Sequence, residues 1–328
     1  MKIGTIGTGF ITEWLNTAFQ DNGLECHAVY SRKEETGKRL ADLYNMPKVY
    51  TDLDEMLKDD ELDCIYIASP NSLHFPQAMK ALNAGKNVIL EKPFVSTVEE
   101  CETLIETAKK NHLFLFEAVT VPYNPNYRKI RERMNDLGEL KVLQCNFSQY
   151  SSKYDKFKNN MNPNVFNPEF SGGALMDINI YNAHFIYGLL GKPNSVRYIP
   201  NIASNGIDTS GILVFDYDGM FASAIGCKDS ASENIVQLQG DKGYIVVHYA
   251  SSVCEKAEVW LKGAKEPEII DLCEGHGGHY WEVNHFKRMM ENNDYEGCYA
   301  MLDYSLEVMK LVHKARLDAG VIFAADKK

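Results

Sequence analysis

The feature that most constrains this chain is a series of short apolar runs, each followed by turn residues and joined to the next by an amphipathic stretch. Runs such as CIYIAS (64–69) and NVIL (87–90) show no alternation of polar and apolar residues. A strand of this kind is buried on both faces, as in a parallel sheet that is covered by helices. The first 120 residues are therefore predicted to form an α/β domain around a parallel sheet.

The elements expected in this first half follow from the same pattern. Strands are predicted over 2–6, 26–31, 64–69, 87–90 and 113–119, and helices over 10–20, 34–44, 74–85 and 98–110. The last residue of the third helix is Gly85, a residue type that commonly ends helices. This order is typical of a doubly wound α/β domain of the Rossmann type, in which helices cover both faces of the sheet.

The pattern changes after residue 125. A helix (126–134), a long strand (141–151), a polar loop (152–169) and a helix from Gly173 to about residue 190 precede successive strands between 195 and 261. Two helices, 279–292 and 299–318, follow. We predict a Rossmann domain over 1–120 and, over 121–328, a second α+β domain with a large, mostly antiparallel open sheet.

Composition narrows the range of partners. With 34 basic and 45 acidic residues the net charge is −11, so neither nucleic acid nor an anionic membrane is expected as a partner. No apolar run reaches the ~18–20 residues of a membrane helix, and the first residues read as a strand rather than a signal peptide. The eight cysteines contain no C-x-x-C pair, which predicts a reducing cytoplasm. His276 and His279 lack further ligands at zinc spacing, and no metal is expected.

A glycine turn, Gly7-Thr8-Gly9, follows the first strand and opens a helix at Phe10-Ile11. The first glycine permits a tight turn and the second lets a pyrophosphate approach the backbone at the helix amino end. The third position of the G-x-G-x-x-G pattern holds Thr12, so the match is partial. These residues are predicted to bind the phosphates of NAD or NADP.

The end of the second strand discriminates between the two cofactors. NAD-binding domains usually place an acidic residue there, ~20 residues after the glycine turn, to hold the ribose hydroxyls. This chain has Ser31-Arg32-Lys33. A hydroxyl and two cations suit the 2′-phosphate of NADP, which is therefore preferred over NAD. Solvated charges at a helix start are the alternative interpretation.

Two further strands end in polar residues, and the carboxyl ends of parallel strands are where ligands bind. Ser69-Pro70-Asn71 follows one strand and Glu91-Lys92-Pro93 the next. Asn71 is expected near the nicotinamide, and His74 either approaches the ribose or caps the following helix. Glu91 is expected to anchor backbone or ribose. Lys92 is either a solvated lysine at a strand end or a functional group.

Taken together, four segments resemble the Gfo/Idh/MocA family of oxidoreductases. They are IGTIGTGFI (3–11), ASPNSLH (68–74), EKP (91–93) and SGGALMDINIYNAH (171–184). The resemblance covers essentially the whole chain. It implies hydride transfer between NAD(P) and a secondary alcohol of a sugar, polyol or trans-dihydrodiol, and a sheet face that forms a homodimer or larger homo-oligomer.

The resemblance also implies roles for individual residues. Lys92 matches the active-site lysine, and Asp177 and Tyr181 match positions that line the substrate pocket. Tyrosine rather than histidine at 181 indicates the branch of glucose-fructose oxidoreductase and dimeric dihydrodiol dehydrogenases. Asn179 departs from that branch, which usually has glycine there. His184, one helical turn beyond Tyr181, is expected to approach the same pocket.

The chemistry of these residue types fits proton transfer. Tyrosine, with a pKa of ~10, is a poor base at neutral pH, and a nearby ammonium group would lower that value. Either Tyr181 exchanges the proton while Lys92 lowers the pKa of its phenol, or Lys92 donates the proton and Tyr181 orients the substrate. Asp177, on the same helix face as Tyr181, binds a sugar hydroxyl or holds Lys92. A tyrosine- and lysine-containing loop (150–155) is a further candidate for reading a polyhydroxylated ligand. A regulator that only senses the dinucleotide is the competing function.

Overall fold

The computed structural model describes residues 1–327, which fall into two compact units. The first comprises Met1–Ala118 together with Glu282–Leu306, and the second comprises Val119–Trp281 together with the chain from Glu307 onwards. The sequence analysis placed everything after residue 120 in the second domain. The difference is that a helical segment near the carboxyl terminus packs into the first unit.

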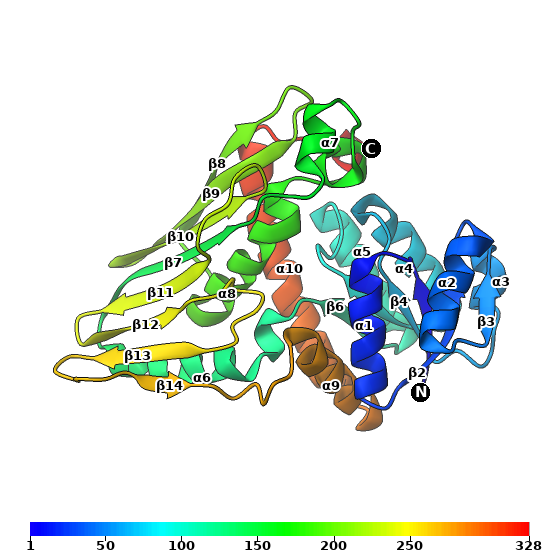
Figure 1. Cartoon of the computed structure of the whole chain (residues 1–328), viewed down its shortest axis with the longest axis horizontal. Coiled ribbons are helices and arrows are strands. Elements are labelled where there is room, and N and C mark those ends of the chain that lie inside the picture. Colours follow the sequence, from blue (N-terminus) through cyan, green and yellow to red (C-terminus); the bar gives the residue numbers. More distant parts are fainter. Residues whose placement is uncertain (328) are drawn as a thin grey trace. The chain divides into compact units, whose positions relative to one another are not determined.

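The first unit is built on a six-stranded parallel sheet with the strand order β3-β2-β1-β4-β5-β6 (Figure 1). This order confirms the predicted Rossmann fold, in which the strand order reverses beside β1. The strands are β1 (Lys2–Ile6), β2 (Glu25–Tyr30), β3 (Lys48–Tyr50), β4 (Cys64–Ile67), β5 (Asn87–Glu91) and β6 (Leu115–Ala118). The helices between them are α1 (Phe10–Asp21), α2 (Glu34–Tyr44), α3 (Leu53–Leu57), α4 (His74–Asn83) and α5 (Val98–Asn111).

The central strands β4 and β5 show why unbroken apolar runs predicted this sheet. All four residues of β4 are buried, and so are four of the five residues of β5. Helix α5 begins at a Thr97 cap whose side chain accepts a hydrogen bond from the Glu100 amide, and Glu99 and Glu100 lie in its first turn. The short elements β3 and α3 were not predicted, because three and five residues are too few to show a period.

Helix α9 (Gly278–Glu291) and the first half of α10 (Tyr295–Asp318) cover the β6 edge of this sheet. The Phe286 ring stacks on Phe116 at a centroid distance of 4.6 Å, and Cys298 Sγ donates to the Leu115 carbonyl over 3.3 Å. At the end of α1, the Asn284 amide donates to Asn22 Oδ1 over 3.0 Å. These contacts explain why the segment belongs to the first unit.

The second unit contains an eight-stranded sheet with the order β14-β13-β12-β11-β7-β10-β9-β8. Neighbouring strands are antiparallel except β7 and β10, which run parallel, as predicted for a mostly antiparallel sheet. The strands are β7 (Leu140–Ser148), β8 (Ser195–Ile202), β9 (Asp208–Tyr217), β10 (Met220–Cys227), β11 (Ile235–Gly240), β12 (Gly243–Val247), β13 (Ala257–Leu261) and β14 (Glu268–Ile270). The helices are α6 (Pro125–Arg133), α7 (Tyr154–Lys158), a π-helical turn (Leu175–Asn179) and α8 (Ile180–Leu190).

The two faces of this sheet differ. Helix α8 packs against β7 and β10, and α6 packs against β13 and β14 (Figure 1). On β10 the residues that face these helices, such as Ala222 and Ala224, are fully buried, whereas Phe221 is 50 % exposed. The outward face therefore carries a row of exposed apolar side chains that includes Ile199, Phe221, Ile225 and Tyr244.

Within residues 1–327, no helix combines the length and hydropathy that crossing a membrane requires.

Candidate functional site

A pocket of about 590 Å³ lies at the carboxyl edge of the parallel sheet in the first unit. It is lined by residues that follow β1, β2 and β4. Among its lining residues are many of the predicted cofactor contacts: Gly7, Thr8, Ser31, Arg32, Lys33, Ser69 and Pro70. Parallel strands bring these separate segments to one edge, as expected for a dinucleotide site.

The glycine turn has the geometry that close approach of a phosphate needs. Gly7 has a φ of +118°, and a Cβ there would lie 2.6 Å from the Ala68 carbonyl oxygen, so residue 7 has to be glycine. A Cβ on Gly9 would meet nothing within 4 Å, and no side chain caps the amino end of α1. The backbone N–H groups of the helix start are therefore accessible to a pyrophosphate. Thr12, the departure from the glycine pattern, is fully buried beneath the turn.

Two buried polar atoms at this pocket support the same assignment. Ser69 Oγ and Gln77 Oε1 have no hydrogen-bond partner within residues 1–327. Buried polar groups are normally paired, and both residues line the pocket. A ligand with polar edges, such as a nucleotide, would satisfy them.

The end of β2 gives the pocket its charge. Arg32 and Lys33 line it, and no Asp or Glu appears among the residues of the described chain that do so. Ser31 is held in place because its amide donates to the Tyr50 carbonyl over 3.0 Å, and its hydroxyl lies 2.6 Å from that of Thr36. Two cations without a carboxylate favour a phosphate over free ribose hydroxyls.

His74 is the first residue of helix α4. It is 1 % exposed, and its Nδ1 and Nε2 each lie 3.0 Å from a backbone carbonyl oxygen, of Pro93 and Ser69 respectively. Burial lowers its pKa, and the charge of Lys92 acts in the same direction. A neutral ring donates to one of these carbonyls, and it packs between the segments that follow β4 and β5.

Glu91 and Lys92 end strand β5 at the same edge. The Glu91 carboxylate is buried and accepts a hydrogen bond from the Tyr66 hydroxyl over 2.8 Å. Lys92 is partly exposed, and its peptide bond to Pro93 is cis. Asn71 begins a short 3-10 turn directly after β4. The exposed Phe10 and partly buried Ile11 open helix α1.

In the second unit, the segment SGGALMD starts a helix on which three predicted site residues lie. A Cβ on Gly172 would lie 2.5 Å from the Val165 carbonyl oxygen, and one on Gly173 would meet the Asp208 carboxylate. Asp208 is fully buried and accepts hydrogen bonds from the Leu175 amide and the Tyr198 hydroxyl, each over 2.7 Å. Burial raises its pKa. The two glycines thus let a carboxylate from β9 hold the helix start.

Asp177 lies within the π-helical turn, and Tyr181 follows in α8. The Asp177 carboxylate forms an ion pair with Lys228, the residue after β10. A sugar hydroxyl or Lys92 was the predicted partner of Asp177, and Lys228 was not predicted. Tyr181 is partly buried and packs on Phe147, Ile178 and Ala250. Single-turn π-helices are frequent at functional sites.

Asn179, the departure from the related branch, faces the sheet. It is fully buried, its amide donates to the Ala224 carbonyl over 3.0 Å, and its Oδ1 accepts from Asn182 over 2.9 Å. On the facing strand, a Cβ at Gly226 would lie 2.5 Å from Asn179 Cβ. The buried Asn179 side chain therefore needs the space that glycine leaves at position 226 of the facing strand.

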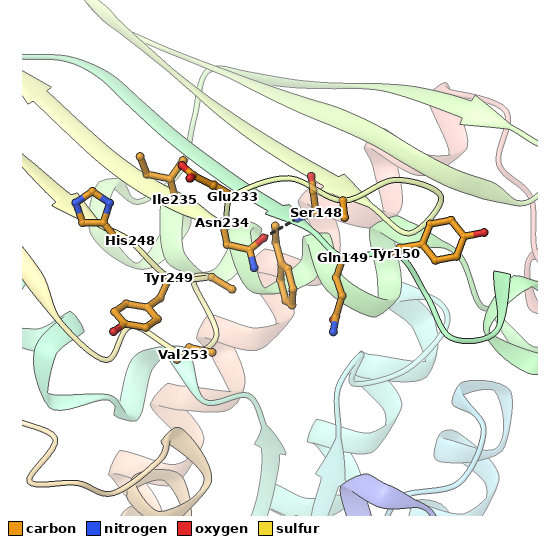
Figure 2. A pocket seen from close by; sticks show the side chains of 12 residues that line it. Ser148, Gln149, Tyr150, Glu233, Asn234, Ile235, His248, Tyr249 and Val253 are labelled. Carbon is orange, nitrogen blue, oxygen red and sulfur yellow. Dashed lines mark hydrogen bonds between the residues drawn. The ribbon is translucent and has the colours of Figure 1, made fainter. Parts of the chain in front are cut away.

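A pocket of about 770 Å³ lies next to this helix within the second unit. Three segments line it: the end of β7, the loop before β11 and the chain after β12 (Figure 2). Phe147 and Ala250, on which Tyr181 packs, are among the lining residues. The polar lining residues include Gln149, Tyr150, Glu233, Asn234, His248 and Tyr249. His184 is 1 % exposed and lies in the buried face of α8. Asp177, Tyr181 and His184 are not among the lining residues of this pocket.

Three residues with clear roles in these geometries were missed. Gln77 lies on α4, where its spacing resembles that of any polar helix residue. Arg39 on α2 donates to the Thr8 carbonyl over 3.0 Å and pairs with Glu13 over 2.8 Å, and so braces the glycine turn. Lys228 follows a strand, and the sequence alone does not bring it to Asp177. None of the three has a local sequence signal.

Comparison with known proteins agrees with these two units. The family model described as "Oxidoreductase family, NAD-binding Rossmann fold" matches residues 1–119, and the one described as "GFO/IDH/MocA C-terminal domain" matches residues 127–246. The fold and the glycine-turn pocket define the chain as an NAD(P)-binding oxidoreductase.

Similar proteins include three named enzymes. The scyllo-inositol 2-dehydrogenase (NADP(+)) IolU of Bacillus subtilis is 32 % identical, over 100 % of this chain and 99 % of IolU. A trans-1,2-dihydrobenzene-1,2-diol dehydrogenase of Mus musculus is 24 % identical over 100 % of this chain and 99 % of that protein. The 3-ketoreductase KijD10 from Actinomadura kijaniata, solved with NADP and TDP-benzene, superposes with a TM-score of 0.84 at 20 % identity, covering 98 % and 99 % of the two chains. The chain belongs to the Gfo/Idh/MocA family, as its motifs predicted.

Proposed function

We propose that this oxidoreductase uses NADP and interconverts a secondary alcohol and a ketone on a sugar or cyclic polyol. The observation that carries the substrate class is the lining of the 770 Å³ pocket. Amide, carboxylate, imidazole and phenol groups lie there next to the apolar Phe147 and Val253. Such a mixture suits a ring with hydroxyls at its edge and C–H groups on its faces. IolU, whose name states an inositol ring as substrate, supports the same class.

The chain's own residues would handle the proton. When bound, the nicotinamide supplies or accepts the hydride. We assign the proton to Tyr181 and Lys92: the phenol holds it at its hydroxyl, and the ammonium group lowers the phenol's pKa and hydrogen-bonds the substrate oxygen. The alternative, in which Lys92 itself gives up the proton, is distinguished by the variants below. Asp177 accepts a hydrogen bond from a neighbouring substrate hydroxyl.

The experiment follows absorbance of the reduced nicotinamide with NADP or NAD and a panel of inositols, aldoses and a trans-dihydrodiol. Turnover of an inositol or aldose with NADP is the expected result. Tyr181→Phe should lower kcat by ~10²–10⁴-fold, and Lys92→Met should do the same. If Lys92 is the direct donor, Lys92→Met loses far more activity than Tyr181→Phe. Unchanged turnover in both variants would contradict the assignment.

The preference for NADP is proposed from Arg32 and Lys33 in the cofactor pocket. A charge-assisted hydrogen bond contributes ~1.5–3 kcal/mol, so Arg32→Asp should weaken NADPH binding by roughly 10–150-fold and leave NADH binding similar or tighter. Fluorescence titration of both cofactors measures the ratio. An unchanged NADPH/NADH ratio in Arg32→Asp would show that the 2′-phosphate is not read here.

We also propose a homodimer in the cytoplasm. The outward sheet face exposes Ile199, Phe221 and Ile225, and exposed apolar patches of this kind usually mark an interface. Light scattering should give twice the chain mass, and Ile225→Lys should give the monomer mass, while Leu43→Lys on α2 of the other unit should not. A monomeric wild type would contradict the dimer. The eight cysteines, all within residues 1–327, form no disulfide, which suits a reducing compartment.

A further inference from the structure

Lys228 is a buried cation in the second unit. Its residue is 6 % exposed, and charged side chains are rarely so buried unless they are paired. Two backbone hydrogen bonds fix it: its amide donates to the Thr209 carbonyl, and its carbonyl accepts from the Ser151 amide, each over 2.9 Å. The backbone of residue 228 is therefore held in place by both neighbouring segments.

Its partner is the Asp177 carboxylate. On the other side the ammonium nitrogen lies 5.9 Å from the centroid of the Phe166 ring, which packs on Tyr154 and Phe157 of the α7 segment. The two partners differ in accessibility, because 30 % of the Asp177 side chain is exposed but only 8 % of the Lys228 side chain. A ligand can therefore reach the Asp177 carboxylate more easily than the Lys228 ammonium group.

The net charge of this pair decides what kind of ligand the carboxylate accepts. A lone carboxylate next to a pocket attracts a cation, such as an amino sugar, more strongly than a neutral hydroxyl. With Lys228 beside it, the pair is neutral, so the carboxylate remains a hydrogen-bond acceptor without a net field. Lys228 would thus create selectivity by removing the electrostatic attraction that favours a cationic ligand over a neutral one.

We propose that Lys228 is a specificity-determining residue: it neutralises Asp177 and thereby makes the enzyme prefer neutral polyhydroxylated substrates over amino-substituted ones. This inference rests on the proposed function, which places Asp177 against the substrate. Lys228 is a positioning residue, since it acts through the carboxylate. The prediction is that the ratio of the two affinities follows the net charge of the pair.

The test uses the full chain saturated with NADP and two probes, scyllo-inositol and scyllo-inosamine, in which one hydroxyl is replaced by an ammonium group. Calorimetry gives both dissociation constants. Lys228→Met removes one positive charge from beside Asp177 and should shift the ratio of affinities roughly tenfold or more towards the amine. Asp177→Asn removes one negative charge and should shift the ratio the other way. The Asp177→Asn/Lys228→Met double variant has the net charge of the wild-type pair and should return the ratio to the wild-type value, although both probes bind more weakly.

Lys192→Met is the matched control, because it removes the same charge from an exposed turn after α8 and should leave the ratio unchanged. If Lys228 had only a structural role, its loss would weaken the binding of both probes equally. An unchanged ratio of affinities in Lys228→Met therefore overturns the inference, while the proposed function stands. Lys228→Arg, which keeps the charge, should keep the wild-type ratio and serves if Lys228→Met does not fold. A wild type that neither binds nor turns over any inositol or aldose overturns the proposed function, and this inference with it.

Discussion

The contact between Asn179 and Gly226 gives a prediction that can be worked out in numbers. Gly226→Ala would place a Cβ 2.5 Å from Asn179 Cβ and 2.8 Å from its Cγ, against a favourable carbon–carbon separation of ~3.5–4.0 Å. Asn179 has little freedom to move, because it is fully buried and hydrogen-bonded to Ala224 and Asn182. Overpacking of this kind lowers the free energy of unfolding by ~1–3 kcal/mol.

Substitutions at the second position separate this clash from other effects. Asn179→Gly removes the Cβ that clashes, whereas Asn179→Ala keeps it, and both remove the same two hydrogen bonds. Each single change at 179 should cost ~2 kcal/mol for the lost bonds, and glycine ~1 kcal/mol more within a helix. Adding Gly226→Ala should then cost ~1–3 kcal/mol on top of Asn179→Ala, and clearly less on top of Asn179→Gly, where only the 3.2 Å approach to the Cα of residue 179 remains.

Equilibrium urea unfolding of the six proteins, followed by circular dichroism, measures these differences as a double-mutant cycle. The coupling energy between 179 and 226 should be large only when residue 179 has a Cβ. If Gly226→Ala costs the same when combined with Asn179→Gly as when combined with Asn179→Ala, the explanation that the Cβ of Asn179 requires glycine at position 226 is refuted.

Three further predictions concern titration, thiol access and a buried ion pair. Burial lowers the pKa of His74 below 6.5, so on acidification the histidine is protonated in the unfolded chain before it is protonated in the folded one. The free energy of unfolding should therefore be highest above pH 6.5 and fall by up to about 1.4 kcal/mol per pH unit below it. A His74→Asn variant with the same acid slope in urea unfolding would contradict this. Ellman's reagent should modify one thiol of the folded protein rapidly, that of Cys227, because the other cysteines are buried and burial raises the pKa of Cys26 and Cys298 to about 12. Cys227→Ser should abolish this fast reaction. A fast reaction that persists in Cys227→Ser would contradict the assignment. Asp326→Asn leaves the fully buried Arg316 without its carboxylate and should cost ~3–5 kcal/mol in thermal unfolding, whereas Asp318→Asn in the exposed pair with Lys314 should cost under ~1 kcal/mol; equal losses would mean that burial of the pair has no effect.

The sequence was sufficient for the features that local patterns encode. Unbroken apolar strands predicted the parallel sheet, and the glycine turn and Arg32 predicted segments that line one pocket. Each of these signals lies within a few neighbouring residues, and the rule that parallel strands share a carboxyl edge brought them together.

Features that depend on packing between distant segments were not predictable. Lys228 reaches Asp177 only because β10 pairs with β7 and β9 beneath helix α8. Likewise, the sequence left open whether His74 approaches the ribose or caps the following helix, and tertiary packing places its ring nitrogens beside the carbonyl groups of Ser69 and Pro93. The π-helical turn at Asp177 has a period that differs too little from an α-helix over five residues to be read from the sequence.

The route of the chain through the two units has a consequence for synthesis in the cell. The dinucleotide-binding unit starts with the first residue but is completed by Glu282–Leu306, whose Phe286 ring covers Phe116 on the last strand. A nascent chain that has emerged only to residue 118 therefore leaves the β6 edge bare, and domains usually fold as units during synthesis. Almost the whole polypeptide must be synthesised before Glu282–Leu306 can pack on the β6 edge and complete this unit. A fragment ending at Ala118 is accordingly a poor choice for isolating the cofactor site, and an early stop codon removes both units at once.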